Sequence, residues 1–164
     1  FLPVSWARRC VIRDSNIWET LTGVALSAEQ RINDGMIDID GLTMDEKVLV
    51  YADPDLIHQV AYNLLDNAIK FTPDGGVIRM SVRVNQGICT VIVQDNGVGI
   101  SPEDRPHVFE RFYTADKAHT SGKGTGLGLS ICQRIMEMHG QKIKLMDTGD
   151  EAGAAFAFTL DCAK

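Results

Sequence analysis

The sequence lacks an excess of positive charge, because 22 Asp and Glu residues outnumber 16 Lys and Arg residues and give a formal net charge of -6. A surface that binds nucleic acid needs clustered basic side chains, so we expect no nucleic-acid partner. The sequence also lacks any apolar run near the roughly 18 residues that a membrane-spanning helix requires. We therefore expect this domain to make no direct contact with a membrane.

Cysteine is sparse, and its four positions, Cys10, Cys89, Cys132 and Cys162, are far apart in the sequence. They form no Cys-x-x-Cys pair, so the ligand spacing of a structural zinc site is missing. We expect four reduced and mostly buried thiols, as in proteins of a reducing compartment.

What the sequence does contain is enough apolar material for one domain, since 45% of its 164 residues are hydrophobic. The order of the periodic segments places pairs of strands between helices. This order favours an α+β fold, a two-layer α/β sandwich with helices packed on one face of a mixed sheet, over a doubly wound parallel sheet. The predicted helices are 15–34, 54–71 and 127–139, and the predicted strands are 36–40, 48–51, 77–84, 88–93, 142–146 and 154–160.

The predicted helix 54–71 carries an unusual polar stripe. Asn63, Asn67 and Lys70 are spaced i, i+4 and i+7, so they project from one side of the helix. Asparagine is a poor helix former, and an ordinary solvated face would favour Glu, Lys and Gln instead. Two amide oxygens and one ammonium could hold a hard cation and phosphate oxygens together. The alternative is a polar face that is merely exposed.

A second candidate site follows the predicted strand 88–93, where Asp95-Asn96-Gly97-Val98-Gly99 begins a turn. Asn-Gly is a strong turn signal, so a simple tight turn is one interpretation. In the other, a carboxylate at the end of a buried strand accepts a hydrogen bond from the exocyclic amine of adenine. Guanine presents a carbonyl at that place, and Gly97 and Gly99 would let the backbone approach a flat base.

A glycine-rich segment, residues 122–130 (GKGTGLGLS), precedes the predicted helix 127–139. Free backbone amides at a helix N-terminus form a natural anion site, although a flexible hinge is the alternative. The spacing excludes a P-loop, because Lys123 is followed by Gly124 rather than Ser or Thr. It also excludes a dinucleotide fingerprint, because Leu127 and Leu129 occupy the places of the required third glycine.

Taken together and in order, these segments resemble the sequence boxes of sensor histidine kinases. Residues 63–72 (NLLDNAIKFT) resemble the N box and 95–100 (DNGVGI) the G1 box. Residues 109–113 (FERFY) resemble the F box and 124–131 (GTGLGLSI) the G2 box. The resemblance extends from about residue 15 to the end of the chain. It implies the Bergerat fold shared with gyrase B, Hsp90 and MutL, which has a mostly antiparallel sheet.

The resemblance assigns ATP and Mg²⁺ as cofactors and gives roles to individual residues. It implies Asn63 as the magnesium ligand, with Asn67 and Lys70 facing the phosphates as the rest of the catalytic set. It also implies that Asp95 binds the adenine amine. The other nucleotide-contacting residues that it implies are Phe71, Gly97, Gly99, Ile100, Phe112, Gly124, Thr125, Gly126, Leu127 and Gly128.

The resemblance further implies an ATP lid over about residues 100–125, anchored by Phe112, within a longer mobile loop that holds a short helix near 102–109. A loop of this length inside a domain is usually functional. Many relatives carry Arg or Lys directly after Phe-Tyr in the F box, whereas this sequence has Thr114. Lys117, Lys123 or Arg111 could supply the missing cation.

The implied reaction is transfer of the ATP γ-phosphoryl group to a histidine on a separate dimerisation and phosphoacceptor domain, with a response regulator downstream. His58, His107, His119 and His139 all lie inside the catalytic domain, and none has a His-Glu-x-x-x-Pro setting. We therefore expect a monomeric fragment that binds ATP but does not phosphorylate itself. Residues 1–14 are interpreted as a linker remnant. The resemblance places this domain in the cytoplasm, with its parent anchored in the cell membrane.

Two alternatives stay open from the sequence. One is an anti-sigma-factor serine kinase of the same fold, which the F box and the Lys70-Phe71-Thr72 ending disfavour. The other is a degenerate domain that binds nucleotide or a partner without catalysis. Intact Asn63 and Asp95 argue against a loss of binding.

Overall fold

The computed structural model describes residues 10–43, 45–113 and 127–164. Its main sheet has five strands in the order β2-β4-β5-β7-β6. The β2–β4 pair is parallel, and the pairs β4–β5, β5–β7 and β6–β7 are antiparallel. The strands are β2 (Asp38–Asp40), β4 (Val77–Asn85), β5 (Ile88–Asp95), β6 (Ile143–Met146) and β7 (Ala155–Asp161).

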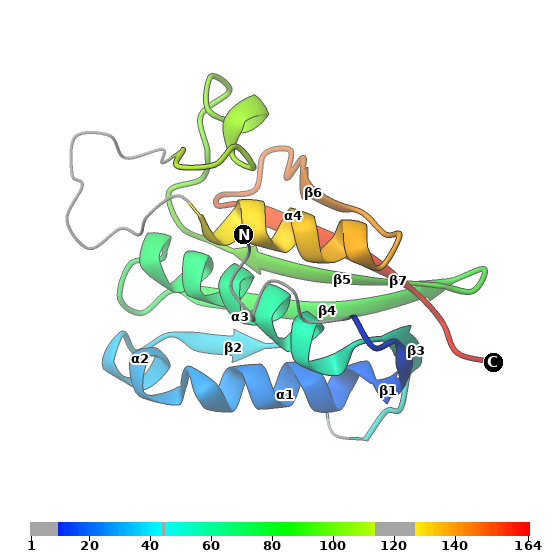
Figure 1. Cartoon of the computed structure of the whole chain (residues 1–164). Coiled ribbons are helices and arrows are strands. Elements are labelled where there is room, and N and C mark those ends of the chain that lie inside the picture. Colours follow the sequence, from blue (N-terminus) through cyan, green and yellow to red (C-terminus); the bar gives the residue numbers. More distant parts are fainter. Residues whose placement is uncertain (1–9, 44, 114–126) are drawn as a thin grey trace.

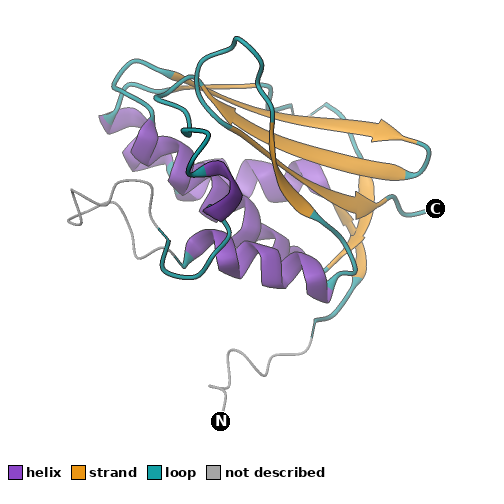
Figure 2. Ribbon diagram, turned by 90° about the horizontal axis from the view of Figure 1, so that it is seen from above, coloured by secondary structure: helices purple, strands orange, loops and turns teal. Residues whose placement is uncertain are grey.

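The helices form a second layer on one face of this sheet, as Figure 2 shows. They are α1 (Ile17–Ser27), α2 (Glu29–Asp34), α3 (Pro54–Phe71) and α4 (Gly128–Met138), and α3 lies between α1 and α4 (Figure 1). The predicted α+β sandwich with a mixed, mostly antiparallel sheet is therefore confirmed. Among the described residues, none of the helices is both long and apolar enough to span a bilayer.

The predicted helix 15–34 is wrong as a single element, because the chain forms two helices that meet at Ala28. The Ser27 hydroxyl donates to the Gly23 carbonyl at 2.9 Å, a contact that competes with the helical ladder and bends helices. The prediction also missed β1 (Arg13–Asn16), which pairs antiparallel with β3 (Leu49–Ala52). The β1 sequence RDSN has no apolar alternation, so its strand depends on β3 rather than on its own pattern.

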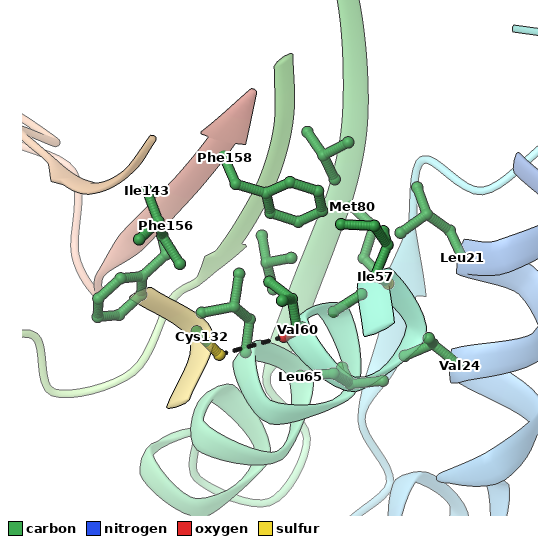
Figure 3. Packing of buried hydrophobic residues seen from close by; sticks show 14 of the residues in the cluster. Leu21, Val24, Ile57, Val60, Leu65, Met80, Cys132, Ile143, Phe156 and Phe158 are labelled. Carbon is green, nitrogen blue, oxygen red and sulfur yellow. Dashed lines mark hydrogen bonds between the residues drawn. The ribbon is translucent and has the colours of Figure 1, made fainter. Parts of the chain in front are cut away.

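The core lies between the helical layer and the sheet. Figure 3 shows Leu21 of α1 and Ile57 of α3 near Met80 of the sheet, whereas Val24 of α1 is turned toward α3. Phe158 of β7 also belongs to this core. The other large core side chains with almost no exposure are Ile17, Val50, Leu64, Leu65, Ile78, Met136 and Leu160. Because these residues come from both layers, α3 is held in one place against the face of the sheet.

All four cysteines are thiols rather than disulfides, with Cys89 and Cys132 buried and Cys10 and Cys162 partly buried. The Cys132 thiol donates to the Val60 carbonyl at 3.7 Å, which links α4 to α3 (Figure 3). Burial raises the pKa of Cys89 and of Cys132 to about 12, so both thiols stay protonated at neutral pH.

Candidate functional site

Helix α3 presents the predicted polar stripe because its N-terminus is capped and its apolar side packs on the sheet. Asp53 caps the N-terminus through hydrogen bonds from the amides of Asp55 (3.1 Å) and Leu56 (3.3 Å), and Pro54 opens the first turn. With the apolar side packed on the sheet, Asn63 and Asn67 are left half-buried on the other side of the helix.

The stripe meets the start of α4. The Asn63 side-chain amide donates to the Gly128 carbonyl (Nδ2···O 3.4 Å), so the structure brings together two residues that lie 65 positions apart. Leu127 takes the N-cap position of α4 and provides no side-chain hydrogen bond to the first turn. Within the described residues, the N-cap side chain therefore does not occupy the first amides of α4, where the helix dipole favours an anion.

Lys70 lies in an ion-pair cluster at the other end of the stripe. Its ammonium is 3.1 Å from Asp66 Oδ2, and Arg31 of α2 pairs with Asp66 Oδ1. Burial alone would lower the pKa of Arg31, but its hydrogen bonds to Asp66 and Tyr62 outweigh this and raise the pKa. The sequence analysis missed Arg31, because its partner Asp66 lies 35 positions away and no local pattern links the two residues.

Asp95 ends β5 in a buried position, with 7% of its surface exposed. Its Oδ1 accepts hydrogen bonds from the amides of Gly97 (2.9 Å) and Ala154 (3.3 Å). In the described part of the chain, no hydrogen bond ends on Oδ2. Burial raises the pKa of Asp95, and the two amide hydrogen bonds offset part of that effect. The site thus holds a buried carboxylate with one oxygen fixed and the other available to a donor.

The glycines around Asp95 are required by the protein's own backbone. A Cβ on Gly97 would lie 2.0 Å from the carbonyl oxygen of Phe71, and a Cβ on Gly153 would lie 2.0 Å from the carbonyl oxygen of Asp95. Gly99 has φ +76° and lies against Gly153. Gly97 was predicted for the close approach of the backbone to a base. The structure shows another requirement, the close approach of Gly97 to the end of α3. Gly153 and Ala154 were missed, because no motif marks them in the sequence.

The beginning of the predicted lid is docked on the sheet. Phe109 packs edge-to-face against Phe156, with ring centroids 5.9 Å apart, and the Arg105 guanidinium donates to the Met146 carbonyl at 2.9 Å. Phe112, which was predicted to anchor the lid, is 66% exposed, whereas Phe109 makes the contact with the sheet. The predicted short helix 102–109 is reduced to a 3₁₀ turn, Arg105–His107.

The comparisons with known proteins agree with this geometry. Residues 52–164 match the family model of the histidine kinase-, DNA gyrase B- and HSP90-like ATPases. The chain belongs to this ATPase family. The catalytic domain of histidine kinase ThkA superposes with a TM-score of 0.77 at 31% identity, covering 92% of this chain and 95% of that one. Within the family, the chain is therefore a catalytic domain of the sensor histidine kinase type.

Two sequence relatives are sensor kinases. The sensor protein KdpD of Clostridium acetobutylicum is 41% identical over 117 residues, which are 71% of this chain and 13% of KdpD. The adaptive-response sensory kinase SasA of Trichormus variabilis is 43% identical over 113 residues, which are 68% of this chain and 27% of SasA. The chain thus spans well under a third of the length of these relatives. Both favour the histidine kinase branch over the anti-sigma-factor kinase.

Three predicted site residues of this ATPase domain lie outside the described residues, namely Gly124, Thr125 and Gly126. Thr114, His119 and the candidate lid cations Lys117 and Lys123 lie outside them as well. The phosphate-wrapping role of the glycine segment and the lid cation therefore stay predictions. Leu127 and Gly128 are described and lie at the start of α4, as expected. Within the described ranges, no group of three or more His, Cys, Asp or Glu side chains could hold a metal ion. A cation at this site would need amide and phosphate oxygens as ligands.

Proposed function

We propose that this chain is the ATP-binding catalytic domain of a two-component sensor histidine kinase, which donates the γ-phosphoryl group of ATP to a histidine on a separate domain. The observation that carries the proposal is the buried Asp95 carboxylate, whose Oδ1 is held by Gly97 and Ala154. Its Oδ2 would accept the adenine amine, and a guanine carbonyl at the same place would meet a buried negative charge.

The phosphates would then extend toward the start of α4. Its first amides and the Lys70 ammonium would offset the negative charge of the phosphates. Asn67 would lie beside them on α3. The Asn63 amide oxygen would hold Mg²⁺, since its Nδ2 already donates to Gly128. Mg²⁺ held there would offset part of the negative charge of the phosphates. The domain's contribution is positioning and charge compensation rather than covalent chemistry.

The attacking imidazole comes from elsewhere. In the described part of the chain, His139 is engaged through both ring nitrogens, because Nδ1 contacts the Ile135 carbonyl at 2.8 Å and Nε2 accepts the Asp53 amide at 3.0 Å. His107 pairs with Glu110, and His58 stacks on Tyr62. We therefore propose that the fragment binds ATP without phosphorylating itself.

The partners follow from this role. Histidine kinase ThkA has been solved in complex with the response regulator TrrA, and the ThkA chain of that complex is 28% identical to this chain. We propose a phosphoacceptor domain of the same full-length protein and a response regulator as partners, and a monomeric fragment. The predicted linker 1–14 would lead to the phosphoacceptor domain only up to β1, because Arg13 and Asp14 already pair with β3. The domain would lie in the cytoplasm, with its parent anchored in the cell membrane.

Calorimetric titration of the purified chain with ATP and with GTP, each with and without Mg²⁺, tests the nucleotide pocket. Tighter binding of ATP than of GTP, improved by Mg²⁺, is the expected result. Incubation with ATP and a purified histidine phosphoacceptor domain of the parent then tests the transfer, which should leave an acid-labile phosphate on the histidine. Absence of ATP binding, even with that domain present, would favour the degenerate interaction domain instead.

Asn63→Ala is expected to weaken ATP binding in Mg²⁺ by roughly tenfold, equal to about 1.4 kcal/mol, and to change Mg²⁺-free binding much less. The reason is that the variant removes a proposed metal ligand but no contact with adenine. Calorimetry at matched ionic strength measures both affinities. Asn67→Ala is the matched control from the same stripe, and its loss is expected to depend less on Mg²⁺. If the Mg²⁺-dependent loss were larger for Asn67→Ala, the metal ligand would be Asn67.

A further inference from the structure

One carboxylate on α3 serves two cations beside the proposed phosphate site. Asp66 directs Oδ2 to Lys70, one helical turn later and 3.1 Å away, and Oδ1 to Arg31 of α2. The side chains are only partly exposed, at 37% for Arg31, 25% for Asp66 and 26% for Lys70. The cluster of Arg31, Asp66 and Lys70 therefore has a net charge of +1 in a partly desolvated place.

Arg31 makes the net charge of the cluster positive rather than zero. Without Arg31, Lys70 and Asp66 would form a neutral pair, and Lys70 would have to leave its carboxylate in order to meet a phosphate. Asp66 would then repel the same phosphate, since like charges at short range raise the free energy of the bound state. With Arg31 in place, Asp66 is compensated from the side of α2 whether or not Lys70 turns toward the ligand.

The cluster also fixes the direction from which Lys70 acts. At about 100° per residue along α3, Asp66 lies on the flank of the stripe, between Lys70 and α2, while Asn63 and Asn67 lie on the other side of Lys70. Tyr62, one turn before Asp66, also contributes a hydrogen bond to Arg31. Arg31 thus joins α2 to the side of the stripe that faces away from Asn67.

We propose that Arg31 is a positioning residue for the nucleotide phosphates, which acts by neutralising Asp66, so that this carboxylate neither repels the phosphates nor holds Lys70 away from them. The proposal rests on the proposed ATP site. Arg31 does not itself touch the phosphates in this role. Its effect should therefore grow with the charge of the ligand and should vanish when Asp66 carries no charge.

The test measures the affinities of the purified chain for adenosine and for Mg-ATP by calorimetry. Arg31→Gln is expected to weaken ATP binding about fivefold, the size typical of a partly exposed charge interaction, and to leave adenosine binding unchanged. Adding Asp66→Asn to Arg31→Gln is expected to restore ATP affinity to within about twofold of the wild-type chain, because no uncompensated carboxylate remains. Arg134→Gln is the matched control, since it removes an equal charge from an Arg–Glu pair whose Arg side chain is 66% exposed on α4.

The outcomes separate the possible roles. An equal loss for adenosine and ATP, together with a lower melting temperature, would show that Arg31 only supports the fold and would overturn the proposal. Failure of Asp66→Asn to rescue ATP binding would also overturn it, because Arg31 would then contact the phosphates directly. If the wild-type chain bound neither ligand, the proposed function itself would be wrong, whereas unchanged ATP binding in Arg31→Gln would reject only the positioning role.

Discussion

Asp95→Asn is expected to lower the affinity for ATP by about 100-fold and to leave the fold intact. An asparagine can keep its amide oxygen at the place of Oδ1, where it would still accept the hydrogen bonds from Gly97 and Ala154. Its NH₂ group would replace Oδ2 and would face the adenine amine donor with another donor. The loss thus falls on binding alone, and calorimetry with ATP together with a thermal melt of the same sample measures both properties.

Asp53→Asn is the matched control for that variant. Asp53 is also buried, at 1% exposure, but its Oδ1 caps α3 through Asp55 and Leu56 rather than facing the proposed adenine site. Asparagine caps helices about as well as aspartate does, so ATP affinity is expected to stay near that of the wild-type chain. Normal ATP binding by Asp95→Asn, or equal losses in the two variants, would contradict the assignment of Asp95 to adenine.

The pH dependence gives a second measure of the same group. Burial raises the pKa of Asp95 above its ordinary 3.8, so this carboxylate takes up a proton at a higher pH than an exposed aspartate does. ATP affinity should therefore fall as the pH decreases through that raised value. The ionised group costs stability above its folded-state pKa, and this cost fades on acidification, so Asp95→Asn should not destabilise the fold at neutral pH. The variant should also lose the acidic fall in ATP affinity.

Those parts of the candidate site that lie within one helix or strand could be predicted from the sequence. The polar stripe of α3 follows from helical spacing, and Asp95 follows from its place at the end of an apolar strand. Likewise, α4 ends at Met138, within one residue of the predicted end of the helix, and Gly140 follows it with φ +67°.

The remaining parts depend on contacts between distant segments, which no local pattern records. Arg31 reaches Asp66 across 35 positions, and Ala154 reaches Asp95 across 59. In the described start of the predicted lid, Phe109 rather than Phe112 packs on the sheet, because Phe156 of β7 lies opposite it. In each case, the tertiary partner decides the role, and a single sequence does not show that partner.

Gly97→Ala is expected to have the largest effect on the fold of the site. The added Cβ would lie 2.0 Å from the Phe71 carbonyl oxygen and 3.1 Å from Asp95 Oδ1, so the turn must move away from the end of α3. Overpacking of this kind costs about 1–3 kcal/mol of stability. The same movement displaces Asp95 from the adenine position, so ATP affinity should fall by tenfold or more, on the order of 1.4 kcal/mol. Urea unfolding and calorimetry measure the two effects.

Gly87→Ala separates loss of stability from loss of the site. Gly87 has φ +79° in the β4–β5 hairpin, at the opposite end of β5 from Asp95, and a Cβ added there would meet no atom within 4 Å. An alanine there strains the backbone by about 1 kcal/mol without displacing a neighbour, so stability should fall while the folded molecules keep their ATP affinity. If Gly97→Ala likewise lost only stability, the contact between the turn and α3 would support the fold without positioning Asp95. If Gly97→Ala alone lost both stability and ATP affinity, the end of α3 would set the position of the Asp95 carboxylate. Because the polar stripe lies on the same helix, α3 would then also set the distance between the proposed adenine position and the stripe.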